Sequence, residues 1–209
     1  MSTPPIVELP ESACFAEILF SIERVVGLTV SPYSRESQAF KWPGEQWKVD
    51  LTLPPMTNRA VANEWKAFGV AMEGKYGQFY IGDPSGKEPL GVATGTPLVD
   101  GAGQLGNTLN TKGWTHNITN ILKAGDYIQV GTGVAARLHM NMTDVDSDGS
   151  GDAELTLQPA LRYAPADGVA ITVHNPVGLF RLASNSFSWR VSPGPVYRIS
   201  LQAEEVVSA

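Results

Sequence analysis

The sequence predicts a mainly β protein with a single flanking α-helix. Its 209 residues include 21 glycines and 15 prolines, and this frequency favours many turns over long helices. A helical hydrophobic period occurs once, whereas alternation of apolar and polar residues, the period of a half-buried strand, recurs along the chain. We therefore expect sheets to carry the core and one helix to lie on a sheet.

The helix is predicted between Asn58 and Gly74. The side chain of Asn58, or of its neighbour Thr57, suits the N-cap position, where it accepts from the first free amide groups. Gly74 suits the left-handed conformation that often ends a helix. Positions i, i+4, i+7 and i+11 of the segment are apolar and fall on one helical face. These four residues are Val61, Trp65, Phe68 and Met72.

The segment 46–53, which precedes the Pro54-Pro55 stop, alternates cleanly between apolar and polar residues. Successive side chains of a strand point to opposite faces of the sheet, so one set is expected against the helix and the core. The other set is free to line a channel or to contact a neighbouring copy. The inward set is Trp47, Val49, Leu51 and Leu53, and the outward, channel-facing set is Lys48, Asp50 and Thr52.

A hairpin is predicted over residues 36–53. Residues 38–42 have the pattern of a short strand, and the dipeptide Pro43-Gly44 is a strong turn signal before the long strand. Phe40 and Trp42 would then flank an exposed turn, which makes this hairpin the expected contact between copies. The predicted self-association residues are Gln38, Phe40, Trp42 and Trp47.

Composition divides the chain into two interleaved domains. The outer segments, 1–83 and 176–209, carry the alternating strands and the helix, whereas residues 84–175 are richer in glycine, threonine and asparagine. Both boundaries fall at proline-containing turns, and exposed turns are where domain insertions succeed. We predict one β domain that is split in sequence and an inserted small β-barrel or sandwich of about five short strands.

Charge and cysteine content exclude several classes of function. The formal net charge is −6, from 15 basic and 21 acidic residues, which argues against nonspecific nucleic-acid binding but permits a surface past which DNA slides. The single cysteine, Cys14, excludes an internal disulfide and a cysteine-based metal site. No apolar run approaches membrane-spanning length and no basic region opens the chain. We expect no membrane insertion and a protein kept in a reducing cytoplasm.

An acidic cluster has part of the spacing of a calcium-binding loop, with acids at positions 1, 3, 5 and 9 and glycine at 6. The bidentate carboxylate required at position 12 is replaced by Leu155, and Glu154 lies one place off. We therefore favour a plain hairpin turn at Asp148-Gly149 over a calcium site. The cluster consists of Asp144, Asp146, Asp148 and Asp152.

Signals for catalysis and cofactors are weak. Gly101, Gly103 and Gly106 match a dinucleotide-binding fingerprint as text, but no helical pattern follows to direct amide groups at a pyrophosphate. No nucleophile-and-base pattern can be nominated, so we predict a non-enzymatic protein without cofactors. The histidines lack metal-ligand spacing and are interpreted as surface or satisfied strand residues. They are His116, His139 and His174.

Tryptophans open an alternative, carbohydrate-binding function. Trp42, Trp47 and Trp114 are candidates for stacking on sugar faces, although Trp47 looks like a core residue by its phase. Trp114, in the glycine-rich part of the insert, is the best remaining glycan candidate. In this alternative the chain is an accessory module that contacts host surface glycans.

The order of several soft motifs carries a family resemblance. In the outer segments the order is Ser31-Pro32-Tyr33, Gln38, Pro43-Gly44, Trp47, Leu53-Pro54-Pro55-Met56, the amphipathic helix and the run from Gly77 to Pro84. The insert adds Gly101 to Gly106, Gly113-Trp114, Leu122 to Gln129 and Leu155 to Arg162. This series resembles minor tail proteins of long-tailed (siphovirus-type) bacteriophages, most of all the distal tail protein type.

The resemblance implies a structural role in a virion. It implies a belt domain, a β-sandwich with a flanking helix, six copies of which form a ring at the distal end of the tail tube. The insert, 84–175, looks more like an OB-like barrel than the larger galectin-like insert of many relatives. The ring would act as a baseplate hub that joins the tube protein to the tail-tip proteins, with DNA only in transit. Assembly would take place in the host cytoplasm.

Overall fold

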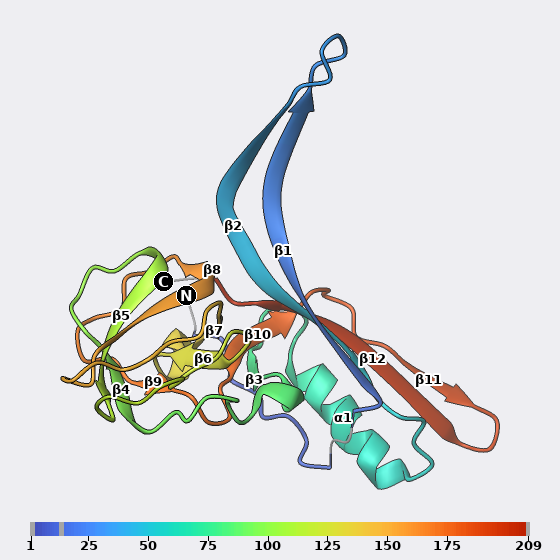
Figure 1. The fold of residues 1–209 in the computed structure, drawn as a ribbon. Coiled ribbons are helices and arrows are strands. Elements are labelled where there is room, and N and C mark those ends of the chain that lie inside the picture. The colour runs from blue at the N-terminus through green and yellow to red at the C-terminus, as the bar shows by residue number, and fades with distance from the viewer. Residues whose placement is uncertain (1–2, 13–14, 208–209) are drawn as a thin grey trace.

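The computed structural model describes residues 3–12 and 15–207, and it is mainly β with one α-helix. The strands form two six-stranded antiparallel sheets, each in a lobe of its own (Figure 1). No helix within the described ranges is long and apolar enough to cross a membrane.

The first sheet has the order β1-β2-β12-β10-β3, and β11 pairs with the first half of β12. β12 therefore belongs to two pairings, because its second half lies between β2 and β10. The helix that packs on this sheet, α1, spans Arg59–Ala71. The strands are β1 (Glu17–Val30), β2 (Ser37–Thr52), β3 (Phe79–Ile81), β10 (Gly178–Leu182), β11 (Trp189–Ser192) and β12 (Val196–Glu205).

The second sheet has the order β4-β5-β8-β7-β6-β9 and is nearly closed into a barrel. The two edge strands meet at a bridge between Leu98 and Ala170, and the Val99 amide donates to the Val169 carbonyl at 2.9 Å. Two 3-10 turns, η1 (Pro84–Gly86) and η2 (Gly133–Ala135), lie in its connections. The strands are β4 (Gly95–Val99), β5 (Gly106–Trp114), β6 (Tyr127–Val130), β7 (Arg137–Asn141), β8 (Ala153–Leu161) and β9 (Ile171–Thr172).

The predicted helix and its apolar face are confirmed. The Asn58 side chain accepts from the Ala60 amide at 2.9 Å, so Asn58 and not Thr57 is the N-cap. Trp65, Phe68 and Met72 are buried, and Val61 is half-buried at the edge of the same core. Edge-to-face aromatic contacts continue from Trp65 through Phe68 to Phe79, and such pairs add to the burial of apolar area. The helix thus braces the first sheet.

The alternation predicted before the helix is also confirmed. All four apolar residues of the inward set are buried, whereas the polar set on the opposite face is half-buried or exposed. Lys48 forms an ion pair with Glu23 at 2.7 Å on that outer face. This hydrogen bond raises the pKa of the Lys48 ammonium group above its ordinary value. Whether the outer face of Lys48, Asp50 and Thr52 lines a channel stays a prediction.

The prediction of a turn at Pro43-Gly44 is wrong. β2 runs unbroken through this dipeptide, and β1 and β2 instead meet at a turn over residues 31–36. There the Ser31 amide donates to the Glu36 carbonyl at 2.8 Å. Pro43 is tolerated because it lies in a β-bulge, where a missing amide donor breaks no regular pairing.

The strands of the two sheets come from separate parts of the sequence, 17–81 with 178–205 and 95–172. Their side chains nevertheless share a core, because Tyr127 and Leu138 of the second sheet pack into the core of the first. Trp47 fixes this junction by donating its indole N–H to the Leu138 carbonyl at 2.9 Å. The domain limits predicted at residues 83/84 and 175/176 stay a prediction about independent folding.

Candidate functional site: the projecting arm and the cavity at its base

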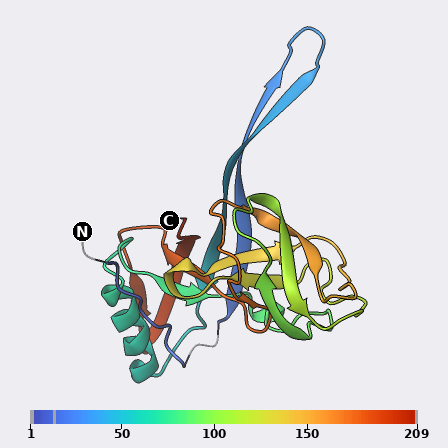
Figure 2. The same cartoon turned by 90° about the vertical axis from the view of Figure 1, so that its left-hand side faces the viewer.

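The distal half of the β1–β2 hairpin stands clear of both lobes (Figures 1 and 2). We call residues 25–42 the arm. Large apolar side chains on it are about half exposed or more, including Trp42 at 52% and Leu28 at 65%. An isolated two-stranded hairpin is at best marginally stable in water, and these exposed apolar side chains make the arm a candidate contact surface.

Register gives the arm two apolar faces, since directly opposite residues of an antiparallel pair share a face. Val25 pairs with Trp42 and Gly27 with Phe40, whereas Leu28 pairs with Ala39 on the other face. The aromatic face therefore holds Val25, Gly27, Thr29, Gln38, Phe40 and Trp42, and the aliphatic face holds Val26, Leu28, Val30, Ser37, Ala39 and Lys41.

The aromatic face is built around a close contact between Trp42 and Gly27. A Cβ atom at Gly27 would lie 2.9 Å from the Trp42 ring, so glycine leaves the space that the indole fills. The Phe40 and Trp42 ring centroids are 6.5 Å apart. Three of the four predicted self-association residues, Gln38, Phe40 and Trp42, lie on this face. The fourth is a correction: Trp47 is 5% exposed and belongs to the core of its own chain.

A charged joint holds the arm at its base. Here the pairing contains a β-bulge, because residues 43–45 of β2 together lie opposite the single residue Arg24 of β1. The Glu45 carboxylate is buried there, 3.3 Å from the Arg24 guanidinium and in an ion pair with Lys41. Burial alone would raise the pKa of Glu45, but the hydrogen bond and charge of Lys41, assisted by Arg24, outweigh it and lower the pKa. Glu45 therefore remains ionised where the arm meets the barrel.

A cavity of about 350 Å³ opens beside this joint, between the arm base, the barrel and the end of β12. Most of its wall is apolar, and its size is within the range of ligand pockets. The ionisable residues of the lining come from four separate segments of the chain. They are Glu45, Arg137, His139, Arg162, Tyr163 and Glu205.

His139, which lines this cavity, also carries a fully buried acceptor nitrogen. Burial lowers the pKa of the imidazole to about 4, so the ring is neutral near pH 7. Its Nδ1 lies 2.7 Å from the Pro159 carbonyl, and a carbonyl can only accept, which places the proton on Nδ1. Nε2 is therefore an acceptor, and it is buried without a hydrogen-bond partner among the described residues. The Nη2 donor of Arg162 is in the same situation.

Glu205 is the second buried titratable group of the cavity. Its carboxylate accepts from the Trp47 amide at 3.2 Å. Burial raises the pKa of Glu205 to about 7, and the hydrogen bond and two nearby arginines offset this only in part. No sequence pattern points to Glu205, and His139 was predicted to be a surface or satisfied strand residue, because the cavity groups lie in separate segments and meet only through the packing of the two lobes.

The acidic cluster of residues 144–152 forms turns. The Asp148 carboxylate accepts from the Ser150 amide at 2.7 Å and from the Asp152 amide at 2.9 Å, which confirms the predicted turn. Asp144 and Asp146 accept from the amides of Ala124 and Asn120. The carboxylates thus bind separate backbone segments, and within the described residues no three metal-ligand side chains gather at one point.

Trp114 is not positioned to bind a glycan, which corrects the sequence-based candidate. The side chain is 2% exposed and lies in the core of the barrel. Its indole N–H donates to the Thr111 hydroxyl at 2.8 Å. A buried ring has no free face on which a sugar can stack, so the phase of Trp114 within β5 decides its role.

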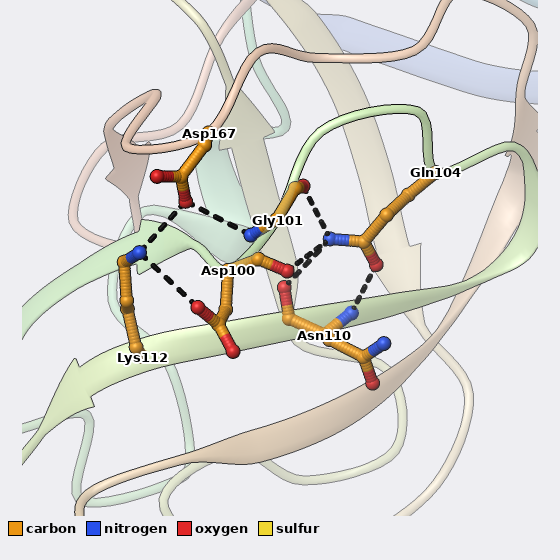
Figure 3. A network of polar contacts seen from close by, with 6 residues as sticks. All are labelled: Asp100, Gly101, Gln104, Asn110, Lys112 and Asp167. Atoms are coloured by element: carbon orange, nitrogen blue, oxygen red, sulfur yellow. Dashed lines mark hydrogen bonds and ion pairs between the residues drawn. The ribbon is translucent and has the colours of Figure 1, made fainter.

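The glycine-rich stretch 101–106 is a structural loop. Gly101, Gly103 and Gly106 have φ angles of 86°, 83° and 86°, and the stretch runs into strand β5 instead of a helix. Figure 3 shows the Gln104 amide group turned back onto its own loop. Its nitrogen donates to three carbonyls and its oxygen accepts from the Asn110 amide at 2.6 Å. The Gly101 amide donates to the Asp167 carboxylate at 2.9 Å, and Lys112 of β5 forms an ion pair with the same carboxylate at 2.7 Å.

Replacing Gln104 with alanine is expected to loosen this loop. Loss of one net hydrogen bond of about 1 kcal/mol speeds amide exchange at Asn110 roughly fivefold, as measured by hydrogen exchange with NMR. Gln104→Glu is the matched variant, because it keeps the acceptor for the Asn110 amide but removes the three donations. Equal exchange in all three proteins would contradict this role of Gln104.

No protein-family model and no curated protein matches the sequence.

Proposed function

We propose that this chain is a structural protein of a long-tailed bacteriophage virion that forms a ring at the distal end of the tail tube. In this proposal the first sheet with α1 is the belt β-sandwich, and the barrel-like second sheet is an OB-like insert. The ring joins the tube protein to the tail-tip proteins as a baseplate hub and carries out no catalysis. A hexamer is the proposed stoichiometry.

The observation that carries the proposal is the projecting arm. Contiguous exposed apolar surface on a soluble chain marks an interaction site, and both faces of the arm have it. The partner we assign to the arm is a second copy of the chain. An arm from one copy that packs on the body of the next is a heterologous contact, and repetition of such a contact closes into a ring.

The outer face of the first sheet fits the inner wall of such a ring. Lys48, Asp50 and Thr52 continue on β12 as Glu204, Gln202 and Ser200, their direct cross-strand neighbours. This polar surface holds charges of both signs, and the chain carries a net charge of −6. A net-acidic wall repels phosphate groups, so DNA in transit would pass without being retained.

The test is the assembly state of the pure protein across concentration. Multi-angle light scattering should show a species of six times 22.4 kDa, about 134 kDa, and negative-stain electron microscopy should show rings. Phage particles from the same source should contain the protein at the end of the tail tube. A protein that stays monomeric at every concentration and is missing from particles would reject the proposed function.

A further inference from the structure

We infer that two oppositely charged surfaces of neighbouring copies meet in the ring, where Arg190 and Arg198 of one copy bind Glu8 and Glu11 of the next. This contact rests on the proposed function and deepens it, because it assigns a second pair of surfaces, besides the arm, that hold one copy to the next. The contact is indicated by an uncompensated pair of arginines, by an acidic hollow beside α1 and by the places of both at opposite edges of the first sheet.

Two arginines of the β11–β12 hairpin lie directly opposite each other. Arg190 of β11 pairs with Arg198 of β12, and like charges in directly opposite positions destabilise a sheet. Both residues are exposed, and neither forms an ion pair among the described residues. Residues 182–203 contain no aspartate or glutamate. An acidic partner surface therefore offsets a repulsion that the chain itself leaves uncompensated.

An open hollow of about 670 Å³ carries the opposite charge. It lies between α1 and the segment 7–12, and its lining includes three glutamates but no lysine or arginine. All three are exposed, and within the described part of the chain none of them forms an ion pair. They are Glu8, Glu11 and Glu64. The hollow thus presents acidic groups that have no basic neighbour in their own chain.

The arginine pair and the hollow belong to opposite edges of the first sheet. The strand β12 is flanked on one side by β11 and on the other by the end of the β2 segment, whose Leu53 amide donates to the Ile199 carbonyl at 3.1 Å. β11 therefore lies at one edge of the sheet. The other edge is β1, which the segment 7–12 precedes in the chain.

The helix α1 shows the same division. The Lys66 ammonium group lies 4.1 Å from the centre of the Tyr197 ring, on the side of the β11–β12 hairpin. Glu64 lines the hollow and accepts from the Ser12 hydroxyl. Two steps of about 100° each separate these helix positions, so the basic and acidic surfaces lie on opposite sides of α1 (Figure 1).

Opposite charges on opposite sides of one chain suit a second copy as the partner. The hairpin does not meet its own hollow, because α1 lies between them. A neighbouring copy in a repeated orientation brings its hollow to this hairpin, and the contact leaves one basic and one acidic surface free for further copies. Such a heterologous contact closes into a ring when the rotation fits. Charge complementarity then fixes which surface of the next copy is chosen.

Charge reversal followed by mixing tests the contact. Arg190→Glu/Arg198→Glu makes the hairpin acidic, and Glu8→Arg/Glu11→Arg gives the hollow a net positive charge. Each variant alone should assemble at least about tenfold more weakly, because like charges then meet between copies. An equimolar mixture should assemble normally, since every hairpin again finds a hollow of opposite charge when the two variants alternate around the ring. Light scattering measures assembly, and native mass spectrometry measures the alternation.

The single variants Arg190→Glu and Lys87→Glu give a matched comparison. Each reverses one exposed cation, but Lys87 lies in a connection of the second sheet, outside both surfaces. Only Arg190→Glu should weaken assembly. Rings that form equally well after reversal of both arginines, or weakened variants that mixing does not restore, would overturn the inference while leaving the proposed function intact.

Zero-length cross-linking separates failure of the contact from failure of the ring. Arg190→Lys/Arg198→Lys keeps both charges and supplies amines that a carbodiimide joins to a touching carboxylate. When ¹⁵N-labelled and unlabelled chains of this variant are mixed, mass spectrometry should find position 190 or 198 of one chain linked to Glu8 or Glu11 of the other. Such a link in a chain that forms no closed ring would reject the ring and support the contact. Rings without the link would reject the contact alone.

Discussion

The double substitution Phe40→Ser/Trp42→Ser is expected to abolish ring formation while the chain stays folded. Both rings are about half exposed, so an interface would cover roughly 100 Å² more on each of them. At about 25 cal/mol per Å², their loss removes about 5 kcal/mol from each contact, which is more than a thousandfold in the association constant. Light scattering at concentrations where the unmodified chain forms rings should show only monomer.

The matched control for this variant is Val70→Ser/Leu90→Ser. It removes two apolar side chains that are more exposed than the arm aromatics and lie outside the arm, and it should assemble normally. Thermal unfolding of both double variants should remain close to that of the unmodified protein, because exposed positions contribute little to stability. An arm variant that still forms rings, or a control that does not, would contradict the assignment of the interface to the arm.

The substitution Glu205→Gln is expected to make stability strongly dependent on pH in weak acid, because it removes one of two buried groups, Glu205 and His139, whose effects on stability oppose each other. The raised pKa of Glu205, about 7 against an ordinary value of 4.5, means that the folded state holds a proton that the unfolded state releases. The stabilisation is complete below pH 4.5 and is lost as pH rises to about 7. Each pH unit in this window lowers the free energy of unfolding by about 1.4 kcal/mol.

His139 has the opposite effect on stability. Its pKa falls from the ordinary 6.5 to about 4 in the folded chain, so its stabilisation is complete above pH 6.5 and is lost as pH falls to about 4. Between pH 4.5 and 6.5 the two slopes are equal and of opposite sign, at about 1.4 kcal/mol per unit. The contributions of Glu205 and His139 therefore cancel in the unmodified chain.

Removing either group should reveal the slope of the other. From pH 4.5 to 6.5, Glu205→Gln should show a free energy of unfolding that rises by about 2 kcal/mol, and His139→Gln one that falls by a similar amount. Urea unfolding at several pH values measures both slopes relative to the unmodified chain, so a constant loss of packing in either variant does not affect the result. Parallel profiles for all three proteins would contradict the assigned pKa values.

Local periodicity made much of the architecture predictable. The face of α1 that holds Trp65 and Met72, and the alternation of Lys48 with Val49, follow from side-chain directions within one element. The turn at Pro43-Gly44 failed because a dipeptide preference competes with cross-strand pairing along the whole hairpin. A Cβ at Gly44 would lie 2.5 Å from Val25, so Gly44 serves the close packing of two strands and not a change of direction.

The cavity was beyond the reach of sequence patterns. Glu45, His139, Arg162 and Glu205 come from β2, β7, the segment after β8 and β12. They converge only because Trp47 and Leu138 hold the two lobes together. Trp114 failed as a glycan candidate for a related reason, since its exposure depends on which face of β5 the barrel closes over.

The bulge at the arm base has a consequence for how such a chain can change in length. Three residues, 43–45, oppose one residue, Arg24, so β2 carries two extra residues there, and an even number leaves every outward side chain outward. The same rule applies to the rest of the arm, where adding or removing an even number of residues keeps each side chain on its face. Insertion or removal of two residues in each strand would move the tip by about 7 Å per step, with the aromatic and aliphatic faces unchanged and the core untouched. The reach of the arm is thus a dimension that can vary in discrete steps independently of the body that carries it.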